Sequence, residues 1–149
     1  MDIDKAKLKS AVKALLERQI TELESLKNNL QESIVSEDKN TAGDKYETAR
    51  AQAQNEMENI AKRININLQS LSNLSRLSVK PMHVVQMGAL VETNLKLFYF
   101  AVPFGNFQFE GQVISVISPA SPIGQNALQK TVGDTITFGN QNHKIVSIK

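Results

Sequence analysis

The sequence predicts an α+β fold in two parts: a long antiparallel α-helical coiled-coil hairpin over residues 1–78 and a small α+β domain over residues 79–149. Charged residues are distributed unevenly. Residues 1–80 contain 13 Lys or Arg and 12 Asp or Glu, whereas residues 81–149 contain 4 Lys or Arg and 3 Asp or Glu. The first part shows helical periodicity, and the second shows short β-branched and aromatic runs broken by Gly and Pro. Each part is therefore expected to have its own architecture.

Two segments of the first part carry apolar residues at every third or fourth position, which places them on one face of a helix. The first stripe comprises Leu8, Val12, Leu15, Leu16, Ile20, Leu23, Leu26, Leu30 and Ile34. The second comprises Tyr46, Ala49, Ala53, Met57, Ile60, Ile64, Leu68, Leu71 and Leu74. Because a short polar stretch joins the segments, the two helices can bury their stripes against each other as a hairpin.

The predicted hairpin is long and narrow. About 30 residues at 1.5 Å per residue give helices roughly 45 Å long. Ala49 and Ala53 lie near the loop, so we expect the helices to approach closely there and the tip to be thin. A hairpin that satisfies its own seam does not need a second copy, and we expect a monomer.

The second part has strand and turn signals. The expected strands are Val84–Val85, Leu95–Phe100, Gln112–Ile117, Thr135–Phe138 and His143–Ile148. The residues Gly139 to Asn142 suggest a hairpin turn. One helix is expected over residues 121–130, with Ser121 as its N-cap and Pro122 as its first helical residue.

The composition excludes several classes of protein. No apolar run approaches the roughly 18 residues of a membrane span, and the start is too polar for a signal peptide. The absence of cysteine excludes disulfides and thiolate metal sites and fits a cytoplasmic protein. His83 and His143 have no companion at ligand spacing. No phosphate-binding loop, dinucleotide fingerprint, nucleophile elbow or zinc signature is present, so we do not expect a self-contained enzyme.

The candidate site is an acidic tip near residues 36–47. It holds Glu37, Asp38, Asp44 and Glu47. Asp44 and Glu47 are three apart, so both carboxylates face one side of a helix start. They form a capping box in one interpretation. In the other interpretation they are ligands of Mg²⁺. Two carboxylates alone bind this ion weakly, because it prefers six oxygen ligands, but they can complete the coordination of an ion in a partner that already holds a metal.

The tip motif resembles that of Gre-type transcript cleavage factors. Gly43-Asp44-x-x-Glu47-x-Ala49 is similar to the family's Gly-Asp-x-x-Glu tip pattern. The block from Gly111 to Asp134 resembles its Ser-Pro-Ile-Gly…Val-Gly-Asp signature, and Val85 to Val91 is similar to the first strand of its C-terminal domain. The likeness follows the family's order of parts and spans nearly the whole chain.

The resemblance implies an FKBP-like C-terminal domain and a factor that binds RNA polymerase. The hairpin would enter the secondary channel, where Asp44 and Glu47 would help position Mg²⁺ of the polymerase active site at the 3′ end of backtracked nascent RNA. The polymerase itself would then cut the RNA, and the factor would bind no cofactor stably. Partner contacts would include Ser121, Pro122, Ile123 and Gly124.

Three questions stay open. The residues after Glu47 are Thr48, Ala49 and Arg50, where the family has Asn and an acidic or aromatic stretch, which favours a channel-binding regulator without cleavage activity. An FKBP-like fold also allows a prolyl isomerase or chaperone, although function belongs to sites rather than folds. Arg50, Lys62 and Arg63 either contact RNA or are solvated helix charges balanced by nearby acids.

Overall fold

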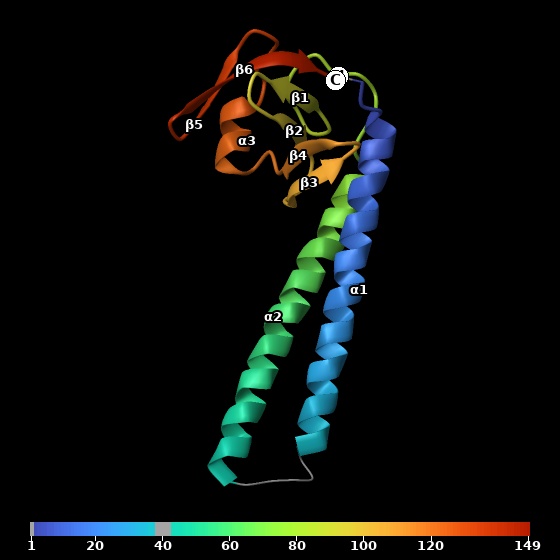
Figure 1. The fold of residues 1–149 in the computed structure, drawn as a ribbon, viewed down its shortest axis with the longest axis vertical. Coiled ribbons are helices and arrows are strands. Elements are labelled where there is room, and N and C mark those ends of the chain that lie inside the picture. Colours follow the sequence, from blue (N-terminus) through green and yellow to red (C-terminus); the bar gives the residue numbers. More distant parts are fainter. Residues whose placement is uncertain (1, 38–42) are drawn as a thin grey trace. The chain divides into compact units, whose positions relative to one another are not determined.

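The structure, a computed structural model, describes residues 2–37 and 43–149; the side chains of residues 36, 37 and 43–46 are not among those described. It confirms the α+β class, with two long helices followed by a sheet and one short helix (Figure 1). The elements are α1 (Lys5–Glu37), α2 (Gly43–Ser75), β1 (Leu90–Thr93), β2 (Leu97–Phe100), β3 (Gly105–Phe109), β4 (Gln112–Ile117), α3 (Pro122–Ala127), β5 (Thr135–Phe138) and β6 (Gln141–Ile148).

By spatial contact the chain forms two compact units. One contains residues 14–71, the greater part of α1 and α2. The other contains residues 1–13 and 72–149, so the start of α1 and the end of α2 belong to the same unit as the sheet. The division at residues 78 and 79, made from sequence character, remains a prediction about domain organisation.

The helices bury the predicted stripes, but unevenly along their length. Leu8, Val12, Leu16 and Ile20 of α1 are buried, whereas its later stripe residues are at best half-buried. On α2 the prediction for Leu68 is wrong: this side chain is 49% exposed, and the neighbouring Asn67 is half-buried instead. Both residues fit a helical period, so apolar spacing alone could not choose between them.

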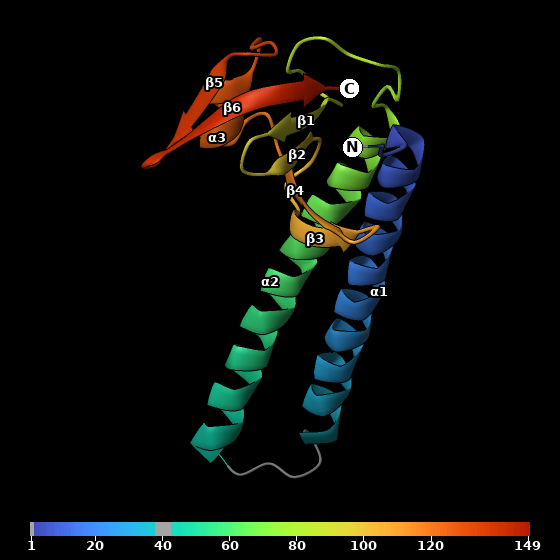
Figure 2. The same ribbon diagram turned by 45° about the horizontal axis from the view of Figure 1, so that its top comes forward.

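The expected close approach of the helices near the loop does not occur. Figures 1 and 2 show α1 and α2 lying farther apart toward the loop than along the rest of residues 14–71. Ala49 and Ala53 are only half-buried there. An alanine side chain offers little apolar surface, so small residues permit a close contact without supplying the burial that would hold it.

Polar contacts fix the start of the first helix. Asp4 is the N-cap, because its Oδ1 accepts from the backbone N–H of Ala6 at 2.9 Å and from that of Lys7 at 3.4 Å. The buried Lys5 ammonium donates to the carbonyl oxygens of Lys80 at 2.9 Å and Lys149 at 3.0 Å. Burial lowers the pKa of this ammonium. These bonds join the start of α1 to two distant segments of the same compact unit.

The sheet has six strands in the order β3-β4-β2-β1-β6-β5. Its neighbours are antiparallel except for β2 and β4, which are parallel. Two expected strands, Gln112–Ile117 and Thr135–Phe138, have the predicted bounds. The edge strand β3 was not predicted, although Phe107 and Phe109 alternate with polar residues along it.

The expected strand at Val84–Val85 is wrong, because Val84 makes only an isolated antiparallel bridge with Thr131 and Val85 bonds to the segment that follows α3. Val85 N–H donates to the Lys130 carbonyl, and the Val85 carbonyl accepts from Gln129 N–H, each at 2.9 Å. Gln129 also has a φ of 70°, in the left-handed region. These features end the helix at Ala127, earlier than the expected residue 130.

One face of the sheet packs on α3 to form the main apolar core. The buried members of this core are Val85, Ala89, Val91, Phe98, Phe100, Ile123, Ala127, Ile136 and Ile145. The opposite face carries a second buried row, because side chains alternate along a strand. In that row Tyr99 of β2 lies between Leu90 of β1 and Val116 of β4, and all three are buried.

Tyr99 is a buried polar residue without a partner. Its side chain is fully buried, and among the described residues its hydroxyl is the one buried side-chain polar atom that lacks a hydrogen bond. Burial raises the pKa of this hydroxyl to about 12. A buried hydroxyl without a bond carries a desolvation penalty.

Replacing Tyr99 with Phe is therefore expected to stabilise the protein by about 1 kcal/mol, since only the unpaired hydroxyl is lost. Urea unfolding followed by circular dichroism would measure the change. Tyr99→Leu is the matched comparison, because it also removes the hydroxyl but loses ring volume and should destabilise the protein. A loss of stability in Tyr99→Phe would show that the hydroxyl is bonded, for instance to a buried water.

Candidate functional site

The acidic tip is formed where the two helices meet the loop. Glu37 is the last residue of α1, and Gly43 is the first of α2. Asp44 and Glu47 are thus the second and fifth residues of α2, so Asp44 lies inside the helix rather than at the N-cap preceding it. Asp38, also predicted as part of the tip, lies outside the described residues.

The backbone gives these two acids a common direction and a favourable field. Residues three apart on a helix are neighbours on its surface. The first turn of a helix carries partial positive charge, which stabilises carboxylates there. Glu47 is exposed, whereas the Asp44 side chain lies outside the described residues. Two such acids provide oxygen ligands of the type that Mg²⁺ prefers, but too few to hold it firmly alone.

The described part of the chain contains no group of three or more His, Cys, Asp or Glu residues that could hold a metal ion.

The three basic candidates are exposed but do not form one patch. Arg50 lies one turn beyond Glu47, within reach of the acidic tip. Lys62 is 12 residues farther along α2, which at 1.5 Å per residue is about 18 Å. Arg50 is thus the one basic candidate placed near the tip acids, while Lys62 and Arg63 lie together elsewhere on the helix.

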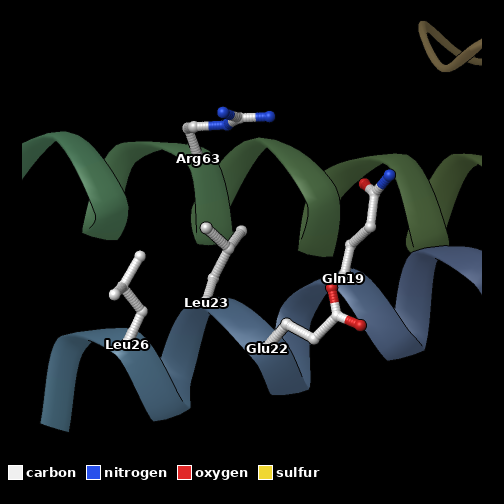
Figure 3. A pocket seen from close by; sticks show the side chains of 5 residues that line it. All are labelled: Gln19, Glu22, Leu23, Leu26 and Arg63. Atoms are coloured by element: carbon white, nitrogen blue, oxygen red, sulfur yellow. The ribbon is translucent and has the colours of Figure 1, made fainter. Parts of the chain in front are cut away.

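Arg63 belongs to a shallow groove on the hairpin. The groove has a volume of about 310 Å³ and is lined by Gln19, Glu22, Leu23, Leu26 and Arg63. Figure 3 shows Gln19, Leu23 and Leu26 projecting from α1 toward α2, with Arg63 on α2. Leu26 is 49% exposed, so the seam at this level is open to solvent.

The predicted partner-binding residues Ser121, Pro122, Ile123 and Gly124 have clear structural roles. The predicted cap is confirmed, since the Ser121 hydroxyl accepts from the Gly124 N–H at 3.1 Å. Ile123 and Gly124 are buried. Pro122 is the exposed member, with Ser121 half-buried. A direct contact with a partner can therefore involve chiefly Pro122.

The two histidines occupy different environments. His83 is exposed, and His143 of β6 is buried. His143 Nδ1 lies 3.4 Å from Thr93 Oγ1, and its ring meets Phe98 edge-on at 5.5 Å. Burial, followed by the charge of Lys96, lowers the pKa of His143 below its ordinary value of 6.5.

This lowered pKa predicts a loss of stability in mild acid. Below pH 6.5 the unfolded chain binds a proton at His143 that the folded chain does not, so stability falls as the pH drops from 6.5 through the lowered pKa. Urea unfolding between pH 7.5 and pH 5 would detect the fall. This loss of stability should be present in His83→Gln and absent in His143→Gln. An equal loss in both variants would show that groups other than His143 cause it.

Sequence reasoning missed one pair of residues that contact each other within the hairpin. Asn67 Nδ2 donates to Gln19 Oε1 at 3.2 Å, from α2 to α1. A polar residue within an otherwise apolar repeat is the signal that could have revealed Asn67.

Together, the fold and the tip define a class of protein: a helical hairpin with acids at the start of its second helix, followed by a small mixed sheet. No helix in the described ranges combines the length and the apolar character needed to cross a bilayer.

No family model and no curated protein matches the chain. Among solved structures it is similar to the GreA factor homolog 1 protein of Thermus thermophilus, at 26% identity over 90% of this chain and 94% of that one, with a TM-score of 0.34. A structure of the transcription factor Gfh1 is similar at 26% identity and a TM-score of 0.34, covering 89% of this chain and 92% of that one. Superpositions this loose assign nothing to the present chain.

Proposed function

We propose that the chain is an accessory factor of RNA polymerase that stimulates cleavage of backtracked nascent RNA, with Asp44 and Glu47 acting in the polymerase active site. The observation that carries the proposal is the position of the Gly43-Asp44-x-x-Glu47 motif. In sequence it resembles the tip motif of Gre-type factors, and in the structure it begins the second helix directly after the loop.

The chemistry of the tip supports this role. Hydrolysis of a phosphodiester develops charge on the attacking and leaving oxygens, and Mg²⁺ bound in a two-metal arrangement stabilises that charge. Asp44 and Glu47 would supply oxygen ligands to such an ion and accept a hydrogen bond from the attacking water. Because two carboxylates bind Mg²⁺ weakly, the factor would be inactive until the polymerase provides the remaining ligands.

Arg50 is the basic residue best placed to assist. It follows Glu47 by three residues, so it lies on the neighbouring turn of α2 and is exposed. We include it as a contact for the phosphates near the RNA 3′ end. Lys62 and Arg63 lie about 18 Å or more farther along α2, and their contact with RNA stays a prediction.

A second candidate function is regulation of the polymerase without cleavage. The residues Thr48, Ala49 and Arg50 favour it, because they differ from the Asn and acidic or aromatic residues that follow the Glu in Gre-type factors. Such a regulator would bind in the same channel and change initiation or pausing.

A cleavage assay separates the two functions. Stalled elongation complexes with 3′-labelled RNA are incubated with the protein and Mg²⁺, each omitted in turn. We expect release of short labelled RNA only in the complete mixture. Binding to polymerase with altered pausing but no released RNA would establish the regulator, and no binding at all would exclude both functions.

A further inference from the structure

The two edge strands of the sheet differ in how they are covered. At the β5 edge, Asn126 Nδ2 of α3 donates to the carbonyl oxygen of Thr137 at 3.2 Å, and α3 packs beside the strand. At the β3 edge, a Cβ placed on Gly105 would meet no atom within 4 Å, and Asn106 and Gln108 are exposed. We call the side of β3 that faces away from β4 the open edge.

The backbone of β3 presents unused hydrogen-bonding groups at the open edge. Glu110 and Gly111, which join β3 to β4, have positive φ values of 50° and 80°, as a type I′ turn requires. Such a turn is closed by a hydrogen-bonded pair, which here includes Phe109. Bonded and non-bonded pairs alternate along an antiparallel ladder, so the N–H and C=O groups of Asn106 and Gln108 point away from β4. No backbone group of the described loops and turns bonds to them.

The open edge also lacks the features that usually prevent one sheet from joining another. Edge strands are commonly protected by lysine, proline, a β-bulge or inward-pointing charges. The residues of β3 are Gly, Asn, Phe, Gln and Phe, and their register with β4 runs without a shift. Glu110 is the single charged residue between Lys96 and Lys130. A strand that pairs here therefore meets an uncharged edge.

The open edge is complementary to a second copy of itself. An antiparallel pairing with its two-fold axis at Phe107 places Asn106 of one copy opposite Gln108 of the other, on both sides of the axis. Each of these pairs can exchange two N–H···O=C bonds, so the outward groups of both residues are satisfied. Glu110 lies away from the axis and does not face its own copy. The contact is isologous, as in most homodimers.

A row of aromatic side chains would add apolar contact to this pairing. Phe107 lies between Phe104 and Phe109, with ring centroids 6.0 Å and 6.2 Å away, and all three side chains are half-buried. At the axis Phe107 would face Phe107 of the second copy in a non-hydrogen-bonded pair, where side chains lie closest. Cross-strand aromatic pairs stabilise a sheet, and the exposed half of each ring would lose contact with water.

We propose that β3 is a self-association edge, through which two copies of the chain join their sheets antiparallel about Phe107. The monomer expected from the sequence followed from the hairpin seam, which takes no part in this contact. The inference is also independent of the function proposed above. One short strand from each copy gives a small interface, so the association is weak and reversible.

Sedimentation equilibrium of the full chain between about 10 µM and 1 mM tests for the dimer. We expect the average mass to rise from that of one chain toward that of two. Gln108→Pro removes an outward N–H, and an edge strand accepts proline where that group faces solvent. It should weaken association by about tenfold or more. Gln108→Thr keeps the N–H and is the matched control, which should associate like the natural protein.

A second substitution protects the test against a folding defect. Gln108→Lys adds a charge of the kind that guards natural edges, without changing the backbone, and should weaken association as well. Circular dichroism and the urea midpoint of each variant verify that the sheet is intact. A monomer at every concentration would overturn the inference and leave the open edge to a strand of another protein. Association unchanged in both Gln108→Pro and Gln108→Lys would overturn it too, because the dimer would then use another surface.

Disulfide formation tests the register. The chain has no cysteine, so each substitution introduces a single thiol. Phe107→Cys should cross-link to its own copy under mild oxidation, because Cα atoms of a non-hydrogen-bonded pair are about 4.5 Å apart, within the range of a disulfide. Asn106→Cys and Gln108→Cys should each stay uncross-linked alone but cross-link to each other in an equal mixture. Equal cross-linking by all three variants alone would contradict the pairing about Phe107.

Discussion

Replacing both tip acids, as Asp44→Ala with Glu47→Ala, should reduce stimulated RNA cleavage by about a hundredfold or more while leaving polymerase binding unchanged. Ligands to a catalytic metal contribute several kcal/mol of charge stabilisation in the transition state, and each 1.4 kcal/mol is about a factor of ten in rate. Labelled RNA released from stalled complexes gives the rate, and co-sedimentation with polymerase gives the binding.

A second pair of substitutions separates chemistry from helix capping. The side-chain oxygens of Asn and Gln can accept the same backbone hydrogen bonds as those of Asp and Glu. Asp44→Asn with Glu47→Gln should therefore keep the helix start and still abolish cleavage. Glu56→Gln with Glu58→Gln, two exposed acids farther along α2, is the matched control and should remain active. Full activity of the Asn and Gln pair would leave Asp44 and Glu47 as structural residues only.

Gly124→Ala should destabilise the sheet domain by about 1–3 kcal/mol, with a larger loss if the backbone cannot adjust. A Cβ at this position would lie 2.8 Å from the Cα and from the carbonyl carbon of Pro119, and closer still to the Ser118 carbonyl oxygen. These are backbone atoms, which cannot move aside as a flexible side chain would. The midpoint of urea unfolding measures the effect.

Two neighbours of Gly124 complete that experiment. Gln125→Ala is the control for stability, because Gln125 is exposed on the same helix and should change stability by less than about 0.5 kcal/mol. Pro122→Ala tests partner contact at the exposed position. If the loss of polymerase binding in Gly124→Ala matches the fraction of protein that is unfolded, Gly124 affects binding only by stabilising the domain. Unchanged stability in Gly124→Ala would mean that Pro119 shifts freely.

Periodicity was sufficient to predict the two long helices, because their apolar stripes extend over many turns. It was insufficient at Asn67, since Leu68 satisfies the same spacing and the bond to Gln19 depends on a residue 48 positions away. The Ser121 cap was predictable because it is local, formed within three residues. The end of α3 was not, because it depends on pairing with Val85.

At the tip, too, some features could be predicted from the sequence and others could not. Sequence spacing placed Asp44 and Glu47 on one side of a helix start, and the backbone of α2 agrees, apart from the position of Asp44 inside the helix. The basic candidates could not be grouped by sequence alone, because nearness depended on where the helix begins. Once α2 is continuous from Gly43, Arg50 falls beside the acids and Lys62 does not.

The strand order has a consequence for biosynthesis. The C-terminal strand β6 lies between β1 and β5 rather than at an edge, so no partner strand can join β1 to β5 until residue 148 has left the ribosome. The pairing of residues 14–71 needs nothing downstream of them and can form while the rest is still being translated. The helical arm can therefore form before the sheet is complete, because the sheet needs its last strand, β6, in an interior position.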